Sequence, residues 1–400
     1  MTPGFSRLSV AGYRRLKSVD IALRPLNLLI GANGVGKSAV LDVIRLLAAS
    51  ANGRLAAAIS ELGSFQFLLT ADGATKAITF GVQIDQTDAS PVDYALQLSP
   101  AGLSYAIDRE YLTPRVAIVV PPQPTSTILN PDGMPLSSPH NPIDADLSRV
   151  KYFLGGKYIE PDWEYKWSET ALSQTPKAIH DAEGFRHALA DVSEVYHCLD
   201  VSRRAPVRTP QILSPAQTPG TNGEDLISCL YTMRETARER FDTVEDALRA
   251  AFPAMERLDF PPVGGGLVAL GWKEHGFSRP FYASELSEGT LRFLWLATLL
   301  QSPGLPRITL IDEPEVSLHP EMLRLLAELM REASERSQLI VATHSDRLVR
   351  FLEPAELLIC DRDDAGMMTV QWADALDLKE WLEDYTLDQL WSKGILGGRS

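Results

Sequence analysis

The sequence predicts an α/β fold with a mixed sheet, an antiparallel β subdomain and a helical insertion. Three observations point to this fold. Short strands open the chain, an apolar strand at 26–30 leads directly into a helix, and apolar strands alternate with helices from residue 281 onward. Strands with continuous apolar runs that alternate with helices are typical of a parallel sheet covered on both faces.

Residues 1–99 are predicted to form the N-terminal part of the main domain. Short strands are expected within 5–31, and side chains at 77–85 and 92–98 alternate as in antiparallel strands. A helix is expected from Ser38 to about Ala49, because its apolar residues recur at a spacing close to 3.6.

Residues 100–280 are predicted to form an insertion or lid region that is partly irregular and partly helical. The stretch 114–142 holds eight of the 27 prolines, and a second proline-rich run lies near 206–219. Amphipathic helices are expected at 224–234 and 237–252.

Residues 281–400 are predicted to complete the main domain. We expect helices at 287–301, 320–335 and 345–352, strands at 308–311, 338–343 and 356–360, and a terminal helical segment. The chain has no internal repeat and no sustained heptad, so neither a solenoid nor a long coiled coil is expected.

The composition excludes several classes of protein. Apolar residues make up 45% and charged residues 22% of the 400 positions, which excludes a disordered or collagen-like chain. The cysteines form no CxxC pair, so a disulfide framework and a cysteine-rich zinc site are not expected. No apolar run is long enough for a membrane-spanning helix or a secretory signal. We therefore expect a cytoplasmic protein without a membrane partner.

The charge of the chain is unevenly distributed. The net charge is −14, whereas residues 1–60 alone carry eight basic and two acidic side chains, a local net charge of +6. This segment is either a basic patch on an acidic body or a scatter of solvated charges.

A glycine-rich segment, GANGVGKS at 31–38, follows the apolar strand and opens the first helix. It matches G-x-x-x-x-G-K-S in the context that this motif requires. Glycines let the backbone N–H groups converge on phosphates, and the positive end of the helix dipole adds to the attraction. We expect phosphate contacts from Asn33, Gly34, Val35 and Gly36, a β/γ-phosphate contact from Lys37, and a Mg²⁺ ligand in Ser38. The alternative is a chance glycine-rich turn.

Two adjacent carboxylates, Asp312 and Glu313, end the apolar strand ITLI. At the carboxyl end of a strand beside a phosphate loop, one carboxylate can hold Mg²⁺ and the next can orient water. The alternative is an ion-paired strand end.

Two further segments carry candidate site residues. His344 follows the apolar strand in VATHS and is a candidate contact for the γ-phosphate; a lone histidine would otherwise be a hydrogen-bonded loop residue. In LSEGT, Ser287 is a natural N-cap, and the helix start that it opens can receive an anion. Taken alone, LSEGT is also compatible with a simple capped helix.

Taken together, these segments resemble the ABC-type ATPases, and most closely the RecF/SMC-like branch linked to DNA repair, recombination and phage defence. Lys37 lies in what looks like Walker A, Asp312 and Glu313 in Walker B, and His344 at the switch histidine. LSEGT is similar to the signature motif and EVSLHP (315–320) to the D-loop. The resemblance covers roughly half the chain and implies a P-loop NTPase fold of the ABC-type head.

The resemblance implies an ATPase that dimerises around two ATP molecules with Mg²⁺. Glu313 would be the general base, Asp312 and Ser38 the Mg²⁺ ligands, and His344 a γ-phosphate contact. The other subunit would contribute Ser287 and Gly289. The segment GYRRLKSVDIAL implies that Arg14 or Arg15 contacts adenine, and Gln66, Gln83 and Gln97 compete as the Q-loop residue.

Departures from the family pattern limit what the resemblance implies. The signature reads Ser-Glu-Gly-Thr, so Glu288 stands where the family has glycine and would slow or tune dimer closure. The insert is too short and aperiodic for the long coiled coil of SMC proteins. Only a short segment follows His344, so an appended nuclease domain is not expected.

Three functions remain open from the sequence. The first is an ATP-hydrolysing clamp that acts on DNA, alone or with a nuclease or effector partner, in repair or phage defence. The second is an ATP-dependent regulatory scaffold that controls a partner protein without contacting DNA. The third, the ATPase subunit of a membrane transporter, suits the long insert poorly.

Overall fold

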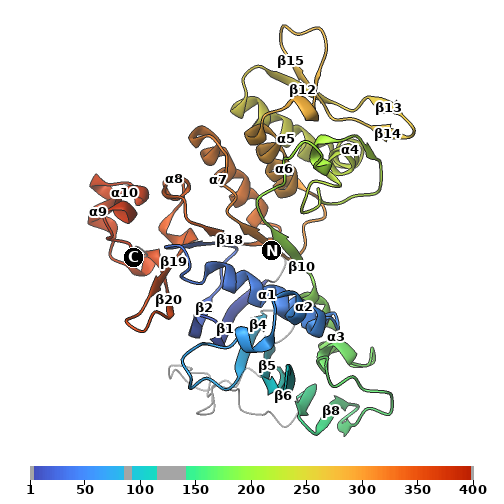
Figure 1. Cartoon of the computed structure of the whole chain (residues 1–400), viewed down its shortest axis with the longest axis vertical. Helices are drawn as coiled ribbons and strands as arrows, with labels where there is room; N and C mark the ends of the chain where they lie inside the picture. Colours follow the sequence, from blue (N-terminus) through green and yellow to red (C-terminus); the bar gives the residue numbers. More distant parts are fainter. Residues whose placement is uncertain (1–3, 85–91, 115–140, 398–400) are drawn as a thin grey trace. The chain divides into compact units, whose positions relative to one another are not determined.

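The computed structural model describes residues 4–84, 92–114 and 141–397. The chain divides into two compact units, whose elements are labelled in Figure 1. Unit 1 comprises Met1–Arg24, Ala32–Val192 and Cys360–Gln371, and unit 2 comprises Pro25–Gly31, Ser193–Ile359 and Trp372–Ser400. The expected features of 115–140 lie outside the described residues.

Unit 1 is built on an antiparallel sheet of eight strands in the order β2-β1-β4-β5-β6-β7-β8-β9. Val10 lies opposite Val19 on one side and Phe80 on the other, and all three are buried. The strands are β1 (Phe5–Tyr13), β2 (Leu16–Ala22), β4 (Ile78–Ile84), β5 (Val92–Ala101), β6 (Ser104–Pro114), β7 (Ile143–Asp146), β8 (Arg149–Leu154) and β9 (Lys157–Ile159).

The sheet extends into the segment expected to be irregular and helical. Strands β6 to β9 were not predicted, and neither was the helix α3 (His180–Ala190). Unit 1 also holds α1 (Lys37–Ala51) and α2 (Leu55–Glu61). The helix expected from Ser38 to Ala49 thus agrees with α1.

A buried carboxyl group fixes the chain after β9 to this sheet. Glu110 on β6 is fully buried and accepts hydrogen bonds from the Tyr94 hydroxyl at 3.0 Å and from the Ala171 and Leu172 amides at 2.6 and 2.8 Å. Burial raises the pKa of Glu110 to about 7, because the charged form is poorly solvated there. This carboxyl group is therefore a structural element of unit 1 that titrates near neutral pH.

Unit 2 contains the parallel sheet that the sequence predicts. β17 (Ile308–Asp312), β18 (Gln338–Thr343), β3 (Leu26–Ile30) and β19 (Leu357–Arg362) pair in parallel in that order, and β10 (Val192–Tyr196) neighbours β17. The segment leading from β19 to β20 (Met368–Trp372) belongs to unit 1. Strands β10 and β20 were not predicted.

Helices account for much of the remainder of unit 2, and Figure 1 shows α4, α5 and α6 packed together. Helix α6 is buried along Thr290–Gln301, as expected of a helix that is apolar on every side. The helices are α4 (Leu226–Thr236), α5 (Arg238–Ala251), α6 (Glu288–Gln301), α7 (Pro320–Ser334), α8 (Asp346–Val349), α9 (Lys379–Asp384) and α10 (Leu387–Ser392). Helix α8 is shorter than the 345–352 expected.

Two small antiparallel sheets complete unit 2. Their orders are β11-β14-β13 and β12-β15-β16. The strands are β11 (Gln211–Ile212), β12 (Met255–Asp259), β13 (Pro262–Gly264), β14 (Leu267–Val268), β15 (Gly271–Glu274) and β16 (Phe281–Tyr282).

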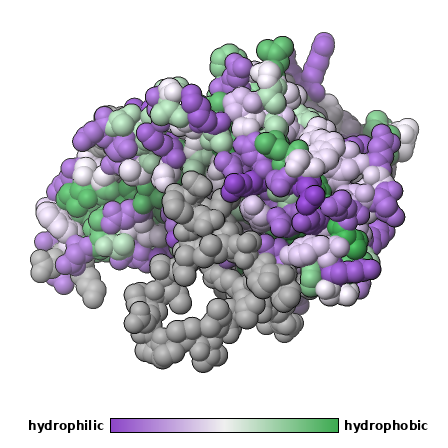
Figure 2. All heavy atoms as spheres, turned by 90° about the horizontal axis from the view of Figure 1, so that it is seen from below, coloured by the Kyte–Doolittle hydropathy of each residue, from purple (hydrophilic) through white to green (hydrophobic). Residues whose placement is uncertain are grey.

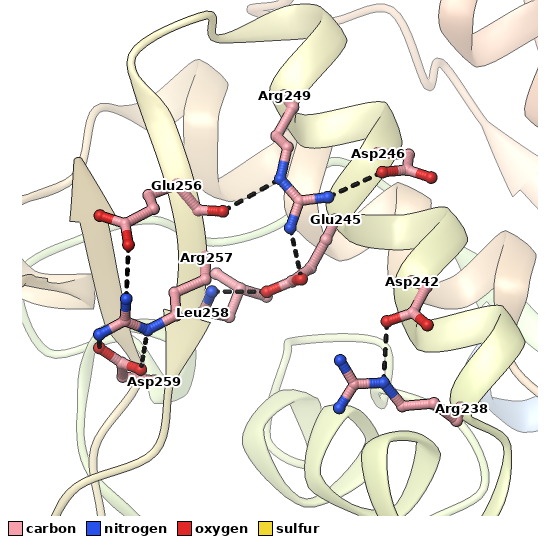
Figure 3. Close-up of polar contacts among 9 residues, drawn as sticks. All are labelled: Arg238, Asp242, Glu245, Asp246, Arg249, Glu256, Arg257, Leu258 and Asp259. Carbon is pink, nitrogen blue, oxygen red and sulfur yellow. Dashed lines mark hydrogen bonds and ion pairs between the residues drawn. The ribbon is translucent and has the colours of Figure 1, made fainter. Parts of the chain in front are cut away.

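A network of ion pairs attaches β12 to α5 (Figure 3). Glu245 is only 5% exposed, and its carboxylate accepts from the Leu258 amide at 2.7 Å and from Arg249 at 2.7 Å. Arg249 also contacts Asp246 and the Glu256 carbonyl oxygen. The buried carboxylate thus has both a charged partner and a backbone donor, which burial of a charge requires.

The described surface is mostly polar on the face drawn in Figure 2, where hydrophobic side chains lie in scattered groups. Within the described ranges, no helix combines the length and the apolar character needed to cross a lipid bilayer.

Candidate functional site

The glycine-rich loop begins at the carboxyl end of β3. Gly31 still belongs to unit 2, and unit 1 resumes at Ala32. Gly36 has a φ of 125°, and a Cβ atom there would lie 3.0 Å from the Met368 sulfur. Only glycine suits this position, both for its backbone conformation and for its close packing.

The first turn of α1 carries no negative charge. Its N-cap is Gly36, no side chain caps it, and no acidic residue lies in its first turn. The positive end of the helix dipole favours a phosphate there. Lys37 extends along the loop, and its Nζ donates to the Ala32 carbonyl oxygen at 3.0 Å. The loop is therefore shaped for a phosphate group.

Arg362, which was not predicted as a site residue, stabilises the same loop. Arg362, near the end of β19, donates from its guanidinium to the Asn33 carbonyl oxygen at 2.8 Å. With Met368 beside Gly36, the 360–371 segment thus contacts the loop from the far end of the chain. No local pattern links residues more than 300 positions apart, so this contact could not be predicted.

The two candidate adenine contacts have partners within unit 1. Arg14 forms an ion pair with Asp42 at 2.7 Å, and its guanidinium carbon lies 5.4 Å from the Tyr13 ring centroid. Asp42 lies one helical turn after Ser38, so this ion pair holds Arg14 beside the start of α1. Arg15 donates to the Gly366 carbonyl oxygen at 2.7 Å. The adenine contact stays a prediction, as does the Q-loop role of Gln66, which donates to Gly102.

In unit 2, the register of the parallel strands aligns their carboxyl ends. Asp312 on β17 lies opposite Ala342 on β18, and Thr343 lies opposite Ile30 on β3. Asp312, His344 and Gly31 therefore all come at or just after the same edge of the sheet, where ligands of α/β proteins bind.

Glu313 and His344 form a polar pair at this edge. The His344 Nδ1 atom lies 3.0 Å from Glu313 Oε1, and both side chains are close to half exposed. The Glu313 amide donates to the Ala342 carbonyl oxygen at 2.8 Å, and its φ of 53° is unusual for a residue with a side chain. The backbone of Glu313 is thus held in a strained conformation that directs this carboxylate.

Glu315 lies behind this pair and was not among the predicted site residues. It is 9% exposed and accepts from the Thr343 hydroxyl at 2.6 Å and the His344 amide at 3.4 Å. Burial raises the pKa of this carboxyl group above its ordinary value. Glu315 orients the turn that carries His344, and the repeated acid in the segment Glu-Pro-Glu was the signal that could have found it.

A second missed residue contacts Asp312. His197 follows β10, and its Nδ1 lies 3.5 Å from Asp312 Oδ2. This pairing was not predicted, because it depends on β10 lying beside β17 and β10 itself was not predicted.

The segment LSEGT is joined to the turn after the carboxylates. Ser287 caps α6 by accepting from the Thr290 amide at 3.1 Å. Glu288 accepts from the Ser317 hydroxyl at 2.8 Å. A Cβ atom on Gly289 would lie 2.7 Å from the Ser317 carbonyl oxygen, so this position requires glycine for its close approach. The two segments thus pack against each other through backbone and side chain.

Two family models match the chain. The model described as "AAA ATPase domain" matches residues 5–96, and the one described as "AAA domain, putative AbiEii toxin, Type IV TA system" matches residues 159–350. No curated protein matches the sequence.

Solved structures of SMC heads share the fold. One is a crystal structure of an SMC head bound to the C-winged helix domain of ScpA: 16% identity, a TM-score of 0.52, and coverage of 92% of this chain and 98% of that chain. Another is the SMC head with an extended coiled coil bound to the C-terminal domain of ScpA from Pyrococcus furiosus, with 13% identity, a TM-score of 0.52, and coverage of 96% and 100%. The chain is thus similar to AAA ATPase domains over residues 5–96 and 159–350, and it shares the fold of SMC heads. Its predicted fold class is confirmed.

The donor groups of this ATPase fit ATP and Mg²⁺, which ATPases of the AAA and SMC type generally use. Among the described residues, no group of three or more histidines, cysteines or acids could hold a metal by itself. Mg²⁺ usually binds through one or two carboxylates together with phosphate oxygens and water.

Proposed function

We propose that this ATPase binds ATP with Mg²⁺, closes as a homodimer around two ATP molecules and hydrolyses them. Residues 33–38 of one subunit hold the phosphates of each ATP, with Ser38 and Asp312 as Mg²⁺ ligands. Ser287 and Gly289 of the other subunit complete the site at the γ-phosphate. The bound Mg²⁺ neutralises charge on the phosphate oxygens.

The observation that carries this proposal is the contact between Glu313 and His344 at the sheet edge from which the glycine-rich loop leaves. Glu313 accepts a proton from the attacking water as a general base. His344 orients that carboxylate and stabilises charge that develops on the γ-phosphate. Glu315 holds the backbone of His344 in place.

The variant Glu313→Gln tests the proposal because it keeps the shape of the side chain and removes the base. We expect ATP binding to persist, turnover to fall by about 100-fold or more, and an ATP-dependent dimer to accumulate. Light scattering after size-exclusion chromatography with ATP measures the dimer. The matched control, Glu335→Gln on an exposed residue, turns over normally. A Glu313→Gln protein that binds ATP and stays monomeric contradicts the dimer.

For the biological role, we propose action on DNA, alone or with a nuclease or effector partner, in repair or phage defence. The support is the resemblance of the sequence motifs to the RecF/SMC-like branch and the net charge of +6 in residues 1–60. The similar SMC heads are bound to a domain of ScpA, which supports a protein partner for this ATPase as well.

One observation favours the alternative, a regulatory scaffold without DNA contact. Among the described residues, ion pairs engage at least four of the basic residues in that segment, namely Arg7, Arg14, Lys17 and Arg45. Paired cations contribute less to attraction of DNA phosphates. A DNA shift assay over a range of salt concentrations separates the two: binding that weakens steeply with salt favours the clamp, and absence of binding at low salt favours the scaffold.

A further inference from the structure

An exposed thiol in unit 2 lies beside a buried cation. Cys198 follows β10 and is exposed, whereas Cys229 and Cys360 are fully buried. An N–H of the Arg292 guanidinium donates to the Cys198 sulfur. The nucleotide site proposed above uses neither residue.

Arg292 is the centre of a network that reaches LSEGT and the turn after the carboxylates. The residue is 8% exposed, and it pairs with Glu288 at 2.9 Å. A second contact, at 3.4 Å, is to the Val316 carbonyl oxygen. Glu288 in turn accepts from the Ser317 hydroxyl. Arg292 thus connects the thiol to both segments that border the proposed γ-phosphate site.

The space around the thiol suits a small polar group. Cys198, Arg292 and Glu313 are the polar members, with His197, of an otherwise mostly apolar lining around a cavity of about 10 Å³, roughly the space of a single water molecule. In the part of the chain that the structure describes, the buried Nε of Arg292 has no hydrogen-bond partner. A buried N–H without an acceptor is costly, so an additional oxygen atom at this place would be favoured.

We propose that Cys198 is a site of reversible oxidation by hydrogen peroxide, and that this oxidation slows ATP turnover through Arg292. The sulfur attacks one peroxide oxygen, an S–O bond forms and the O–O bond breaks. The released hydroxide takes the thiol proton, so the products are a sulfenic acid and water. Sulfur is oxidised by two electrons and the peroxide is reduced.

The new oxygen changes the partners of Arg292. Sulfur is a weak acceptor, whereas a sulfenic oxygen is a strong one. It competes with Glu288 and the Val316 carbonyl oxygen for the guanidinium. Glu288 then loses its cation, and the contact between LSEGT and Ser317 loosens. The effect on turnover rests on the proposed function, whereas the oxidation itself does not.

The first experiment measures oxidation without using ATP hydrolysis. The full chain is treated with hydrogen peroxide, labelled with dimedone and digested for mass spectrometry. We expect label on Cys198 at least tenfold above that on Cys229 or Cys360, and several-fold less label on Cys198 in the variant Arg292→Lys. Equal labelling of the three cysteines, or labelling of Cys198 that is independent of Arg292, overturns the proposal.

The second experiment measures the consequence. Peroxide lowers the turnover of the natural sequence at least fivefold, dithiothreitol restores it, and the variant Cys198→Ser keeps its turnover with and without peroxide. If Cys198 is labelled and the turnover rate is unchanged, the proposed effect of oxidation on turnover is overturned. If the untreated chain hydrolyses no ATP, the proposed function fails, and the labelling experiment still decides whether Cys198 is a site of oxidation.

Discussion

The Nδ1 atom of His344 lies 3.0 Å from the Oε1 atom of Glu313, at the end of neighbouring parallel strands. Glu315 accepts from the Thr343 hydroxyl and the His344 amide, and it thereby holds the turn that carries His344. This arrangement lets a histidine orient the proposed base.

The variant His344→Ala should therefore impair turnover more than binding. We expect the turnover rate to fall by about 100-fold, because a group that stabilises developing charge is lost. ATP affinity, measured by calorimetry with a non-hydrolysable analogue, should change by about threefold or less. His275→Ala, at an exposed position, is the control. Turnover equal to that of the control would remove His344 from the site.

Replacement of Lys37 should act on binding instead. In Lys37→Ala the loop loses its mobile cation, and we expect ATP affinity to fall by about 100-fold, which corresponds to about 3 kcal/mol. The exposed Lys157→Ala is the matched control for loss of one positive charge. Calorimetric titration of both variants measures the difference, and equal affinities would refute the phosphate role of the loop.

The variant Gly289→Ala should destabilise unit 2, because its Cβ atom would lie 2.7 Å from a backbone oxygen. We expect a loss of about 1–3 kcal/mol in the free energy of unfolding. Gly184→Ala is the control: Gly184 lies within α3 with open space around it, so alanine there should be neutral or stabilising. Denaturant unfolding followed by circular dichroism compares them. Equal stabilities would mean that Ser317 moves aside without cost.

The stability of the protein should depend on the protonation of Glu110. Its pKa is raised to about 7 in the folded state from 4.5, so the folded state binds the proton more tightly. The tighter binding of this proton adds about 3 kcal/mol to the free energy of unfolding below pH 4.5. This contribution is lost as the pH rises to about 7. Glu110→Gln mimics the protonated form, so the gap between its melting temperature and that of the natural sequence should widen from pH 5 to pH 8. Parallel curves would show that Glu110 is ionised throughout.

The sequence predicted those parts of the site that lie in short continuous segments. The loop at 31–38 and the carboxylates after ITLI have local patterns that depend on chemistry within a few residues. His197 and Arg362 have no such pattern. Their contacts arise from strand order and from a return of the chain near its end, and pairing partners far apart in sequence leave no periodic signal.

The fold was predictable to a similar degree. Helix α6 and strands β17 and β18 have long apolar runs and were found within one or two residues. Strands β6 to β9 were not predicted, because they flank the proline-rich stretch 114–142, which indicates irregular structure. Strand β6 also carries charged residues, and β7 to β9 are short. Their stability comes from pairing with neighbours and from groups such as Glu110, which local propensity does not report.

The left-handed backbone conformation of Glu313 lowers the stability of the fold, yet the same residue is the proposed catalytic base. Glycine or asparagine would relieve about 1 kcal/mol of strain there, yet neither could serve as the base. Directed evolution of this protein for heat tolerance alone would thus favour variants that fold well and do not hydrolyse ATP. Retention of glutamate at this position in a natural lineage would indicate continued selection for turnover.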